Sequence, residues 1–400
     1  MVQEEQNYSS SSSSSSSKGR VLIITGSTGS MGNYLLNHFL QESTFDKIYC
    51  LNRSEDAYGR QSKSHPLRGL HANFYTDKVE FWKAEFDKDD DLGLGKNRYN
   101  QLLIETTHIL HNAWPVDFNR KVASFTSSIR GTKNLINLAY KTIHHCTFFF
   151  VSSMSTAANW GRYSGLLDRV PEIPLGDWRL ARMGYGQSKL IVEKMLEDVS
   201  QVEGMNVIIC RVGQVAGPVL NKSFGMWNKQ EWLPSLIASS IEMGFIPKTL
   251  GPIDQVDWIP VDILTKVIAE LLLTPIEKNK LGKSKLQIYH ALNPNSTNWS
   301  ALLPVILENS RKTLEPVSIV EWVDRLEQAA SLQPQAQEKL PAINLLLVFF
   351  ENLRDKSIRF PRASSSPLDT TQSSKASKTL RTCPPVSPEW MQIWMDQWKF

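Results

Sequence analysis

The feature that most constrains the fold is a glycine-rich turn that follows a short apolar run. Residues 21–24 read VLII, and residues 25–32 read TGSTGSMG. A strand that ends in such a turn and continues as a helix directs backbone N–H groups and the positive helix end toward one point, which suits a dinucleotide pyrophosphate. Glycines also occur at such turns for steric reasons alone. The pattern predicts a phosphate-binding turn made of Gly26, Ser27, Thr28, Gly29, Ser30, Met31 and Gly32.

A second motif, MGYGQSK at residues 183–189, supplies groups for proton transfer. Tyr185 and Lys189 are four residues apart, so on a helix they share one face. An ammonium group there would lower the pKa of the phenol from its usual value of about 10. We therefore expect Tyr185 to be a proton donor that Lys189 tunes.

An apolar run at residues 148–151 precedes two serines. The run reads FFFV without polar alternation, which is typical of a central parallel strand covered on both faces. Such a strand brings Ser152 and Ser153 to the carboxyl edge of the sheet, where doubly wound folds bind ligands. A shift of one residue in register exchanges the two hydroxyls, so both serines are candidates for the site.

The residues after the second predicted strand, 47–51, indicate which nicotinamide cofactor binds. An acid at this point would bind a ribose 2′-hydroxyl, whereas a cation accommodates a 2′-phosphate. The chain has Asn52, Arg53 and Ser54 here. Arg53 offers a planar fork of donors for phosphate and Ser54 a further donor. The sequence therefore predicts NADPH in preference to NADH.

Three stretches together carry a resemblance to a known family. They are GYGQSK at 184–189, HNAWPVDFN at 111–119 and RVGQVAGP at 211–218. The chain resembles the extended short-chain dehydrogenase/reductase family, and within it the thioester reductase domains that terminate fungal adenylating reductases, nonribosomal peptide synthetases and polyketide synthases of secondary metabolism. The resemblance covers residues 20–262 closely and the remainder loosely. The chain departs from the family pattern at one position, because Val212 follows Arg211 where the family often has a proline.

The resemblance assigns roles to further residues. It implies that Asp87 accepts from the adenine amino group, although residues 87–91 could equally be a solvated turn. It implies that Asn112 and Ala113, at the end of a strand, let the backbone approach the cofactor. It also places the catalytic hydroxyl at Ser153, with Ser152 as the alternative.

The resemblance implies an NADPH-dependent reductive release of a carrier-bound acyl thioester to an aldehyde, with a second hydride transfer that would continue to the alcohol. Tyr185 would protonate the developing oxyanion, Ser153 would hydrogen-bond the same oxygen, and Lys189 would hold the cofactor ribose. One alternative is an enzyme acting on a free aldehyde or ketone, or on a nucleotide sugar as an epimerase or dehydratase. Another is a non-catalytic NADP-binding regulatory module, although such modules often lack the tyrosine or the lysine.

The predicted fold is a doubly wound parallel Rossmann sheet with a smaller, mainly helical C-terminal portion that binds the substrate and the carrier. Residues 1–19 contain a serine tract and predict a disordered linker, either a tail or a tether to a neighbouring domain. The predicted units are an NADP-binding domain at 20–220, a C-terminal portion at 221–400, a segment at 256–292 that returns to the Rossmann domain, and a flexible loop at 362–381.

The C-terminal portion also carries candidate charges for a partner. Between residues 354 and 381 the chain has seven basic residues and two acidic ones, so an acidic carrier protein could dock there. A solvated loop explains the same composition. The seven basic residues are Arg354, Lys356, Arg359, Arg362, Lys375, Lys378 and Arg381.

Composition excludes several other classes of function. The formal net charge is only +4, and basic residues are interleaved with acidic ones, so no nucleic-acid partner is expected. The four cysteines lack metal-ligand spacing and predict buried thiols, with no metal site. No run approaches the roughly 18 apolar residues of a membrane span, and the acidic, serine-rich start does not resemble a signal peptide. We therefore expect a cytoplasmic protein that has no membrane partner, and we separately expect a monomer.

Overall fold

The fold is described from a computed structural model of the chain. It describes residues 19–71, 74, 77–88, 91–163, 169–222, 225, 227–276, 285–332, 340–344, 347–359 and 368–400. The predicted linker lies outside the described residues except for Gly19, as do residues 362–367 of the predicted flexible loop.

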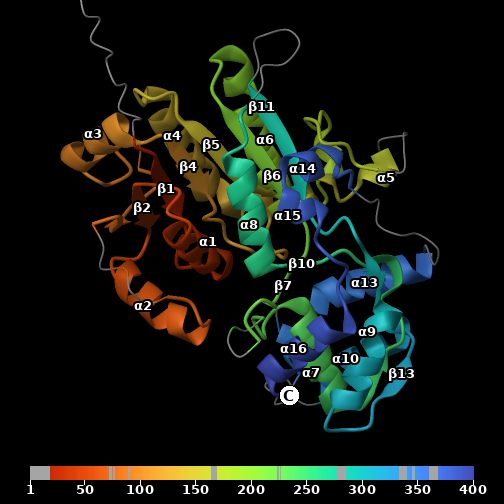
Figure 1. The fold of residues 1–400 in the computed structure, drawn as a ribbon. Helices are drawn as coiled ribbons and strands as arrows, with labels where there is room; N and C mark the ends of the chain where they lie inside the picture. The colour runs from red at the N-terminus through yellow and green to blue at the C-terminus, as the bar shows by residue number, and fades with distance from the viewer. Residues whose placement is uncertain are drawn as a thin grey trace, which may run out of the picture.

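A seven-stranded parallel sheet forms the centre of the molecule (Figure 1). The strand order is β11-β6-β5-β4-β1-β2-β3, so the order reverses between β1 and β4. Ligands of doubly wound sheets bind at such a switch point, outside the carboxyl ends of the strands. The strands are β1 (Val21–Thr25), β2 (Lys47–Asn52), β3 (Val79–Lys83), β4 (His108–His111), β5 (Thr147–Ser153), β6 (Val207–Val212) and β11 (Leu286–Ala291).

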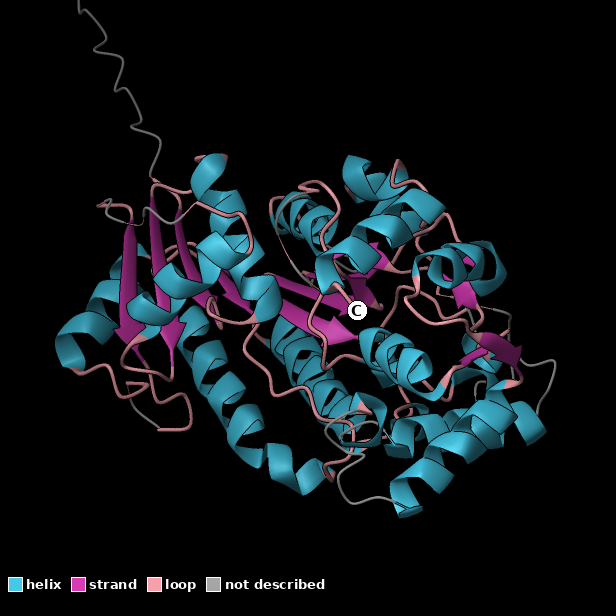
Figure 2. Cartoon of the chain, turned by 90° about the horizontal axis from the view of Figure 1, so that it is seen from below, coloured by secondary structure: helices cyan, strands magenta, loops and turns pink. Residues whose placement is uncertain are grey.

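Helices cover both faces of this sheet, which confirms the predicted doubly wound fold (Figure 2). The central strand β5 lacks polar alternation because both of its faces are buried. Phe149 packs into one hydrophobic core with α1 and α8, whereas Phe148 and Phe150 pack into the opposite core with α4 and α6. The helices beside the sheet are α1 (Ser30–Gln41), α2 (Ala57–Leu67), α3 (Lys96–Glu105), α4 (Thr126–Lys141), α5 (Trp160–Tyr163), α6 (Gly184–Val202) and α8 (Val261–Leu272).

The C-terminal portion is mainly helical, and most of it lies beyond the carboxyl edge of the sheet, whereas residues 371–381 pack beside the sheet against β11 and α8 (Figure 1). Its last helix carries tryptophans at four-residue spacing, and Trp394 and Trp398 are fully buried against Trp227. The helices are α7 (Trp232–Met243), α9 (Trp299–Asn309), α10 (Ile319–Leu332), α12 (Pro341–Asn344), α13 (Leu347–Arg359), α14 (Thr371–Ala376), α15 (Lys378–Arg381) and α16 (Pro388–Trp398).

Short pieces complete the structure and join the two portions. Three two-stranded pairs lie outside the main sheet, and four 3₁₀ turns connect larger elements in the described residues. The short strands are β7 (Val215–Ala216), β8 (Phe245–Pro247), β9 (Gln255–Val256), β10 (Ile259–Pro260), β12 (Thr297–Asn298) and β13 (Glu315–Val317). The 3₁₀ turns are η1 (Val122–Phe125), η2 (Met154–Ala157), η3 (Trp178–Leu180) and η4 (Gly251–Ile253). After β10, helix α8 packs on α1 and β11 pairs with β6.

The prediction of a flexible loop over residues 362–381 is wrong for its described part. Residues 371–376 and 378–381 form α14 and α15, which contact β11 and α8. The buried carboxylate of Glu172 accepts the backbone N–H groups of Gln372 and Ser373, at 2.5 and 2.9 Å. Glu270 accepts from Thr379 Oγ1 at 2.6 Å. Polar composition misled the prediction because two carboxylates from the sheet domain satisfy the polar groups of this segment.

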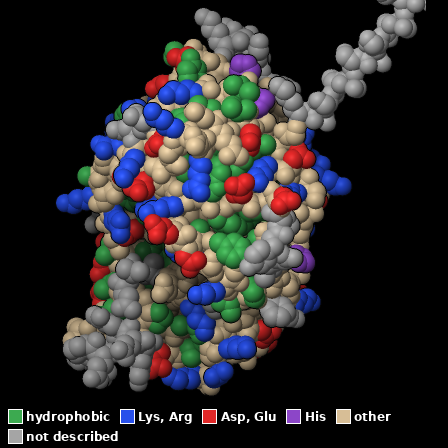
Figure 3. Space-filling model, turned by 90° about the vertical axis from the view of Figure 1, so that its left-hand side faces the viewer, with side chains coloured by type: hydrophobic (Ala, Val, Ile, Leu, Met, Phe, Trp, Pro, Cys, Tyr) green, Lys and Arg blue, Asp and Glu red, His purple; other side chains and the backbone are tan. Residues whose placement is uncertain are grey.

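Several sequence expectations concern the surface and the cysteines. All four cysteines are free and buried. Among the described residues no group of three or more potential metal ligands occurs, and no helix has the length and apolar character needed to cross a bilayer. Figure 3 shows basic side chains interspersed with acidic ones on one face of the molecule.

Candidate active site

The glycine-rich turn after β1 is fixed to the end of β4 by one threonine. Thr25 Oγ1 accepts the backbone N–H groups of Asn112 and Ala113 at 3.1 and 3.0 Å. The same oxygen lies 2.8 Å from Nδ1 of His111. Because Oγ1 already accepts two bonds, its own proton points to Nδ1, so the neutral ring carries its hydrogen on Nε2, 2.9 Å from Thr132 Oγ1. Burial lowers the pKa of His111 to about 3, which keeps this ring uncharged.

The turn itself has the shape of an anion cradle. Gly26 has a φ of 71°, and a Cβ atom there would lie 2.9 Å from Cα of Ala113, so only glycine fits. A Cβ at Gly32 would lie 2.0 Å from the carbonyl oxygen of Gly26. The N-cap of α1, Gly29, has no side chain to cap the first turn, and that turn contains no acid. The backbone and the helix end therefore fit a bound phosphate.

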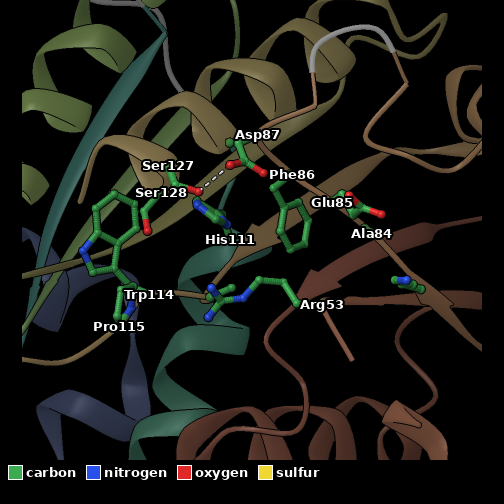
Figure 4. A pocket seen from close by; sticks show the side chains of 13 residues that line it. Arg53, Ala84, Glu85, Phe86, Asp87, His111, Trp114, Pro115, Ser127 and Ser128 are labelled. Carbon is green, nitrogen blue, oxygen red and sulfur yellow. Dashed lines mark hydrogen bonds between the residues drawn. The ribbon is translucent and has the colours of Figure 1, made fainter. Parts of the chain in front are cut away.

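A pocket of about 410 Å³ opens beside this turn (Figure 4). Arg53 extends into it from the end of β2, while Asp87 lies on the far side and accepts from Ser127 Oγ at 2.7 Å. That hydrogen bond lowers the pKa of Asp87, so the carboxylate is charged at neutral pH. Ala113 and Trp114 also line the pocket, and the buried Trp114 Nε1 has no hydrogen-bond partner among the described residues. Ser54, which we expected to add a donor, is not among the lining residues.

The two serines after β5 have different partners. Ser153 Oγ accepts from the backbone N–H and the hydroxyl of Ser155, at 3.2 and 3.0 Å, and its side chain is hydrogen-bonded to Tyr185. Ser152 Oγ instead donates to Oε1 of Glu193, away from the phenol. The geometry thus brings Ser153, and not Ser152, to the tyrosine. A Cβ at Gly186 would lie 2.5 Å from the carbonyl oxygen of Ser155, so this glycine allows α6 to approach the end of β5.

Tyr185 and Lys189 lie on α6 as predicted, but their electrostatics differ from the expectation. Burial raises the pKa of Tyr185 to about 12, and the hydrogen bond with Ser153 only partly opposes it. Lys189 is also buried, which lowers its pKa well below the usual value, while Glu193 opposes that shift. In this structure Lys189 therefore does not lower the phenol pKa.

The surroundings of Lys189 explain how a buried ammonium is held. Its Nζ donates to the carbonyl oxygen of Val151 at 2.6 Å. It also lies 4.5 Å from the ring centroid of Trp114 and 4.6 Å from that of Phe150, within the range of cation–π attraction. The ring of Tyr185 is farther, at 6.0 Å. These contacts fix the Nζ atom of Lys189 between β5 and Trp114.

A buried ion pair lies directly behind the site. Arg211 is fully buried, and its Nη2 donates to Oε2 of Glu193 at 2.8 Å while its Nε contacts both carboxylate oxygens. Its Nη1 lies 3.2 Å from Nε2 of His290, whose Nδ1 lies 2.7 Å from the carbonyl oxygen of Asp369. Ser152, Arg211 and His290 are register partners on three adjacent strands. The C-terminal segment is thereby connected to β5, the strand that carries Ser152 and Ser153.

Sequence reasoning missed the supporting residues of the site. It assigned no individual role to Trp114, His111, Glu193 or Arg211. One signal was present, because Glu193 lies four residues after Lys189 and so shares its face of α6. The pairing of Ser152 with Arg211 depends on strand register and has no local signal.

Comparison with known proteins supports the fold and the class of site. A family model of NAD-binding domains, described as male sterility protein, matches residues 24–268. The chain is 38% identical over 96% of its length to a carboxylic acid reductase of Neurospora crassa, and 30% identical over 95% to 3-methylorcinaldehyde synthase of Talaromyces stipitatus. It spans 35% of the first relative and 14% of the second.

A solved structure has the same fold over nearly the whole chain. It is the terminal R domain from the myxalamid PKS-NRPS biosynthetic pathway, with a TM-score of 0.78 and 23% identity. The match covers 96% of this chain and 91% of that structure. The C-terminal helices are therefore part of the shared architecture.

Proposed function

Because the chain belongs to the NAD-binding family described as male sterility protein and is an oxidoreductase, we propose that it uses NADPH to release a carrier-bound acyl thioester as an aldehyde. The observation that carries this proposal is the hydrogen-bonded pair of Tyr185 and Ser153 at the carboxyl edge of β5, beside the glycine-rich turn. The name of the Talaromyces relative includes an aldehyde product, and that of the Neurospora relative includes the reduction of an acid. Both names support a reductase of acyl groups.

The residues of the chain account for the proton steps. When bound, the nicotinamide cofactor supplies a hydride to the thioester carbonyl carbon. Tyr185, whose pKa of about 12 keeps it protonated at neutral pH, gives its proton to the developing oxyanion. Ser153 donates a hydrogen bond to the same oxygen. The resulting hemithioacetal breaks its C–S bond, so that the hydroxyl proton leaves and the thiolate takes up a proton.

Lys189 would have two tasks in this scheme. Its ammonium lies between β5 and Trp114, where a cofactor ribose hydroxyl would find a donor beside the glycine-rich turn. An ammonium that then turned toward the phenol would assist loss of its proton, which burial alone opposes. The site residues that would hold the cofactor are the turn at residues 26–32, Asn112 and Ala113.

The choice of NADPH rests on the pocket beside the turn. Arg53 is exposed and extends into a space that also contains Lys83, so a 2′-phosphate would meet two cations there. Lys83 Nζ forms a salt bridge with Oε1 of Glu55 at 2.6 Å, so Arg53 would be the principal phosphate ligand. Asp87 remains a proposed acceptor for the adenine amino group, with its carboxylate held by Ser127.

Reduction of simple thioesters tests the proposal. The protein would be incubated with NADPH and a panel of acyl-pantetheine thioesters, while free thiol and aldehyde are quantified. We expect one thiol and one aldehyde to appear for each NADPH consumed, and more NADPH to be consumed if the aldehyde continues to the alcohol. Turnover of free aldehydes or ketones without turnover of any thioester would contradict the proposal.

A further inference from the structure

Two cationic side chains from distant parts of the sequence meet beside the start of α6. Arg182 Nη2 donates to Oδ1 of Asn352 at 2.8 Å. Asn352 orients its amide by donating Nδ2 to the carbonyl oxygen of Val348 at 2.6 Å, which leaves the oxygen for the guanidinium. Lys356 lies one helical turn beyond Asn352 on α13 and so shares its face. The arrangement brings the ammonium near enough to the guanidinium for the two charges to interact.

Salt bridges distinguish this pair from other cations described nearby in the chain. Two other cations close by in the sequence have acidic partners. Arg179 forms a salt bridge with Asp177 at 2.6 Å, and Arg354 forms one with Asp324 at 2.9 Å. Within the described part of the chain, neither Arg182 nor Lys356 forms a salt bridge. Lys356 is exposed, but desolvation by the neighbouring chain lowers its pKa and the charge of Arg182 lowers it further. An anion placed between the two groups would remove this repulsion.

Arg182 lies close to the tyrosine of the site along the chain. Arg182 precedes Tyr185 by three residues, so the two Cα atoms are within about 11 Å of each other. On the solvent side of the phenol, the exposed ring of Phe118 contacts Tyr185 with centroids 5.2 Å apart. Figure 1 shows α13 on the side of the helical portion that faces the sheet. A substrate that extended from Tyr185 toward α13 would therefore pass these cations.

We propose that Arg182 and Lys356 form a subsite for the phosphate of a phosphopantetheine arm whose thioester reaches Tyr185. The inference rests on the proposed function, because it concerns the same substrate. The planar guanidinium would take two phosphate oxygens and the ammonium a third. When extended, the pantetheine arm is longer than the separation between Arg182 and Tyr185, so both ends can be held at once. The site thus recognises the carrier's arm and not only its acyl group.

The test compares two substrates that differ only in the phosphate. The kcat/KM values for an acyl-phosphopantetheine and the matching acyl-pantetheine would be measured for the unaltered protein and for Arg182→Gln, Lys356→Gln and the double variant. Loss of one charge-assisted contact should lower kcat/KM for the phosphorylated substrate about tenfold to a hundredfold. The value for acyl-pantetheine should stay the same. Arg179→Gln is the matched control, because that guanidinium already has an acidic partner.

The outcomes separate this inference from the proposed function. If the unaltered protein reduces both substrates equally well, or if the variants lose equal activity on both, the phosphate subsite is wrong while thioester reduction stands. If neither thioester is reduced, the proposed function fails. Calorimetric titration with phosphopantetheine and with pantetheine then still tests the subsite, since the phosphorylated compound should bind more tightly to the unaltered protein and lose that advantage in the double variant. Equal binding of the two compounds would overturn the inference.

Discussion

The hydroxyl of Ser152 donates a hydrogen bond to the buried carboxylate of Glu193, whereas the next residue in the chain hydrogen-bonds Tyr185. Replacing Ser153 with alanine removes a donor to the reacting oxygen and should lower kcat by about a hundredfold or more. Ser152→Ala should leave kcat within a few-fold, because its hydroxyl serves the ion pair behind the site. Steady-state kinetics of both variants with one thioester check this ranking, and a larger loss in Ser152→Ala would contradict it.

Tyr185→Phe removes the proposed proton donor and leaves the buried ring in place. We expect kcat to fall by about two to four orders of magnitude while the affinity for NADPH is kept. Fluorescence titration of the cofactor, beside single-turnover kinetics, separates the two effects. Unchanged turnover would show that the tyrosine is only structural.

Arg53→Asp places a carboxylate where a 2′-phosphate is proposed to bind. The ratio of kcat/KM for NADPH to that for NADH should fall by about tenfold to a hundredfold, because a charge-assisted contact is replaced by repulsion. Arg53→Gln is the control that removes the charge without adding a new one, and it should give an intermediate ratio. Equal use of both cofactors by the unaltered protein would refute the assignment.

Glu193→Gln leaves the guanidinium of Arg211 buried without its counter-ion. Breaking a buried pair in this way costs about 3–5 kcal/mol of unfolding free energy. Glu321→Gln is a matched control, because Glu321 and Arg325 form an exposed pair on α10 whose loss should cost no more than about 1 kcal/mol. Urea unfolding of the two variants measures the difference. Equal destabilisation would mean that water reaches the Glu193 pair.

Glu231 gives the fold a pH dependence of defined sign. Burial raises its pKa from 4.5 to about 7, opposed by the N–H of Trp227, which donates to it at 2.8 Å. The folded state binds the proton of the Glu231 carboxyl more tightly than the unfolded state does. The resulting contribution to the free energy of unfolding is therefore complete below about pH 4.5 and is lost as the pH rises through 7.

Glu231→Gln keeps an acceptor for Trp227 but does not titrate. The free energy of unfolding of this variant minus that of the unaltered protein should therefore increase as the pH is raised from 5 to 8. The rise should fall short of the full linkage value of about 3 kcal/mol, because the residue is partly exposed to solvent. Urea unfolding at both pH values tests this, and a constant difference between the two proteins would disagree with it.

Local patterns were sufficient to predict the sheet and the positions of the main site residues. The glycine-rich turn, the Tyr185–Lys189 spacing and the apolar β5 each depend on a few consecutive residues, so the sequence contains their signal. The raised pKa of Tyr185 could not be predicted, because it depends on burial by residues such as Phe118 and Phe125.

Contacts between distant segments account for the other differences. Residues 371–381 contain few apolar side chains, and polar composition alone predicts a loop there. Their helical conformation depends on Glu172 and Glu270, which lie about two hundred and one hundred residues earlier in the chain. A single sequence does not reveal such a pairing.

The attachment of α14 and α15 to Glu172 and Glu270 bears on how the molecule folds. A chain ending before residue 368 would leave Glu172 buried with most of its hydrogen-bond donors removed, and the register partner His290 would lose the carbonyl of Asp369. Unsatisfied buried groups of this kind are costly. The sheet therefore cannot complete its interior while the ribosome is still synthesising the C-terminal segment. Melting of that segment should spread into β6 and β11, so the nucleotide-binding half and the helical half should unfold as one cooperative unit.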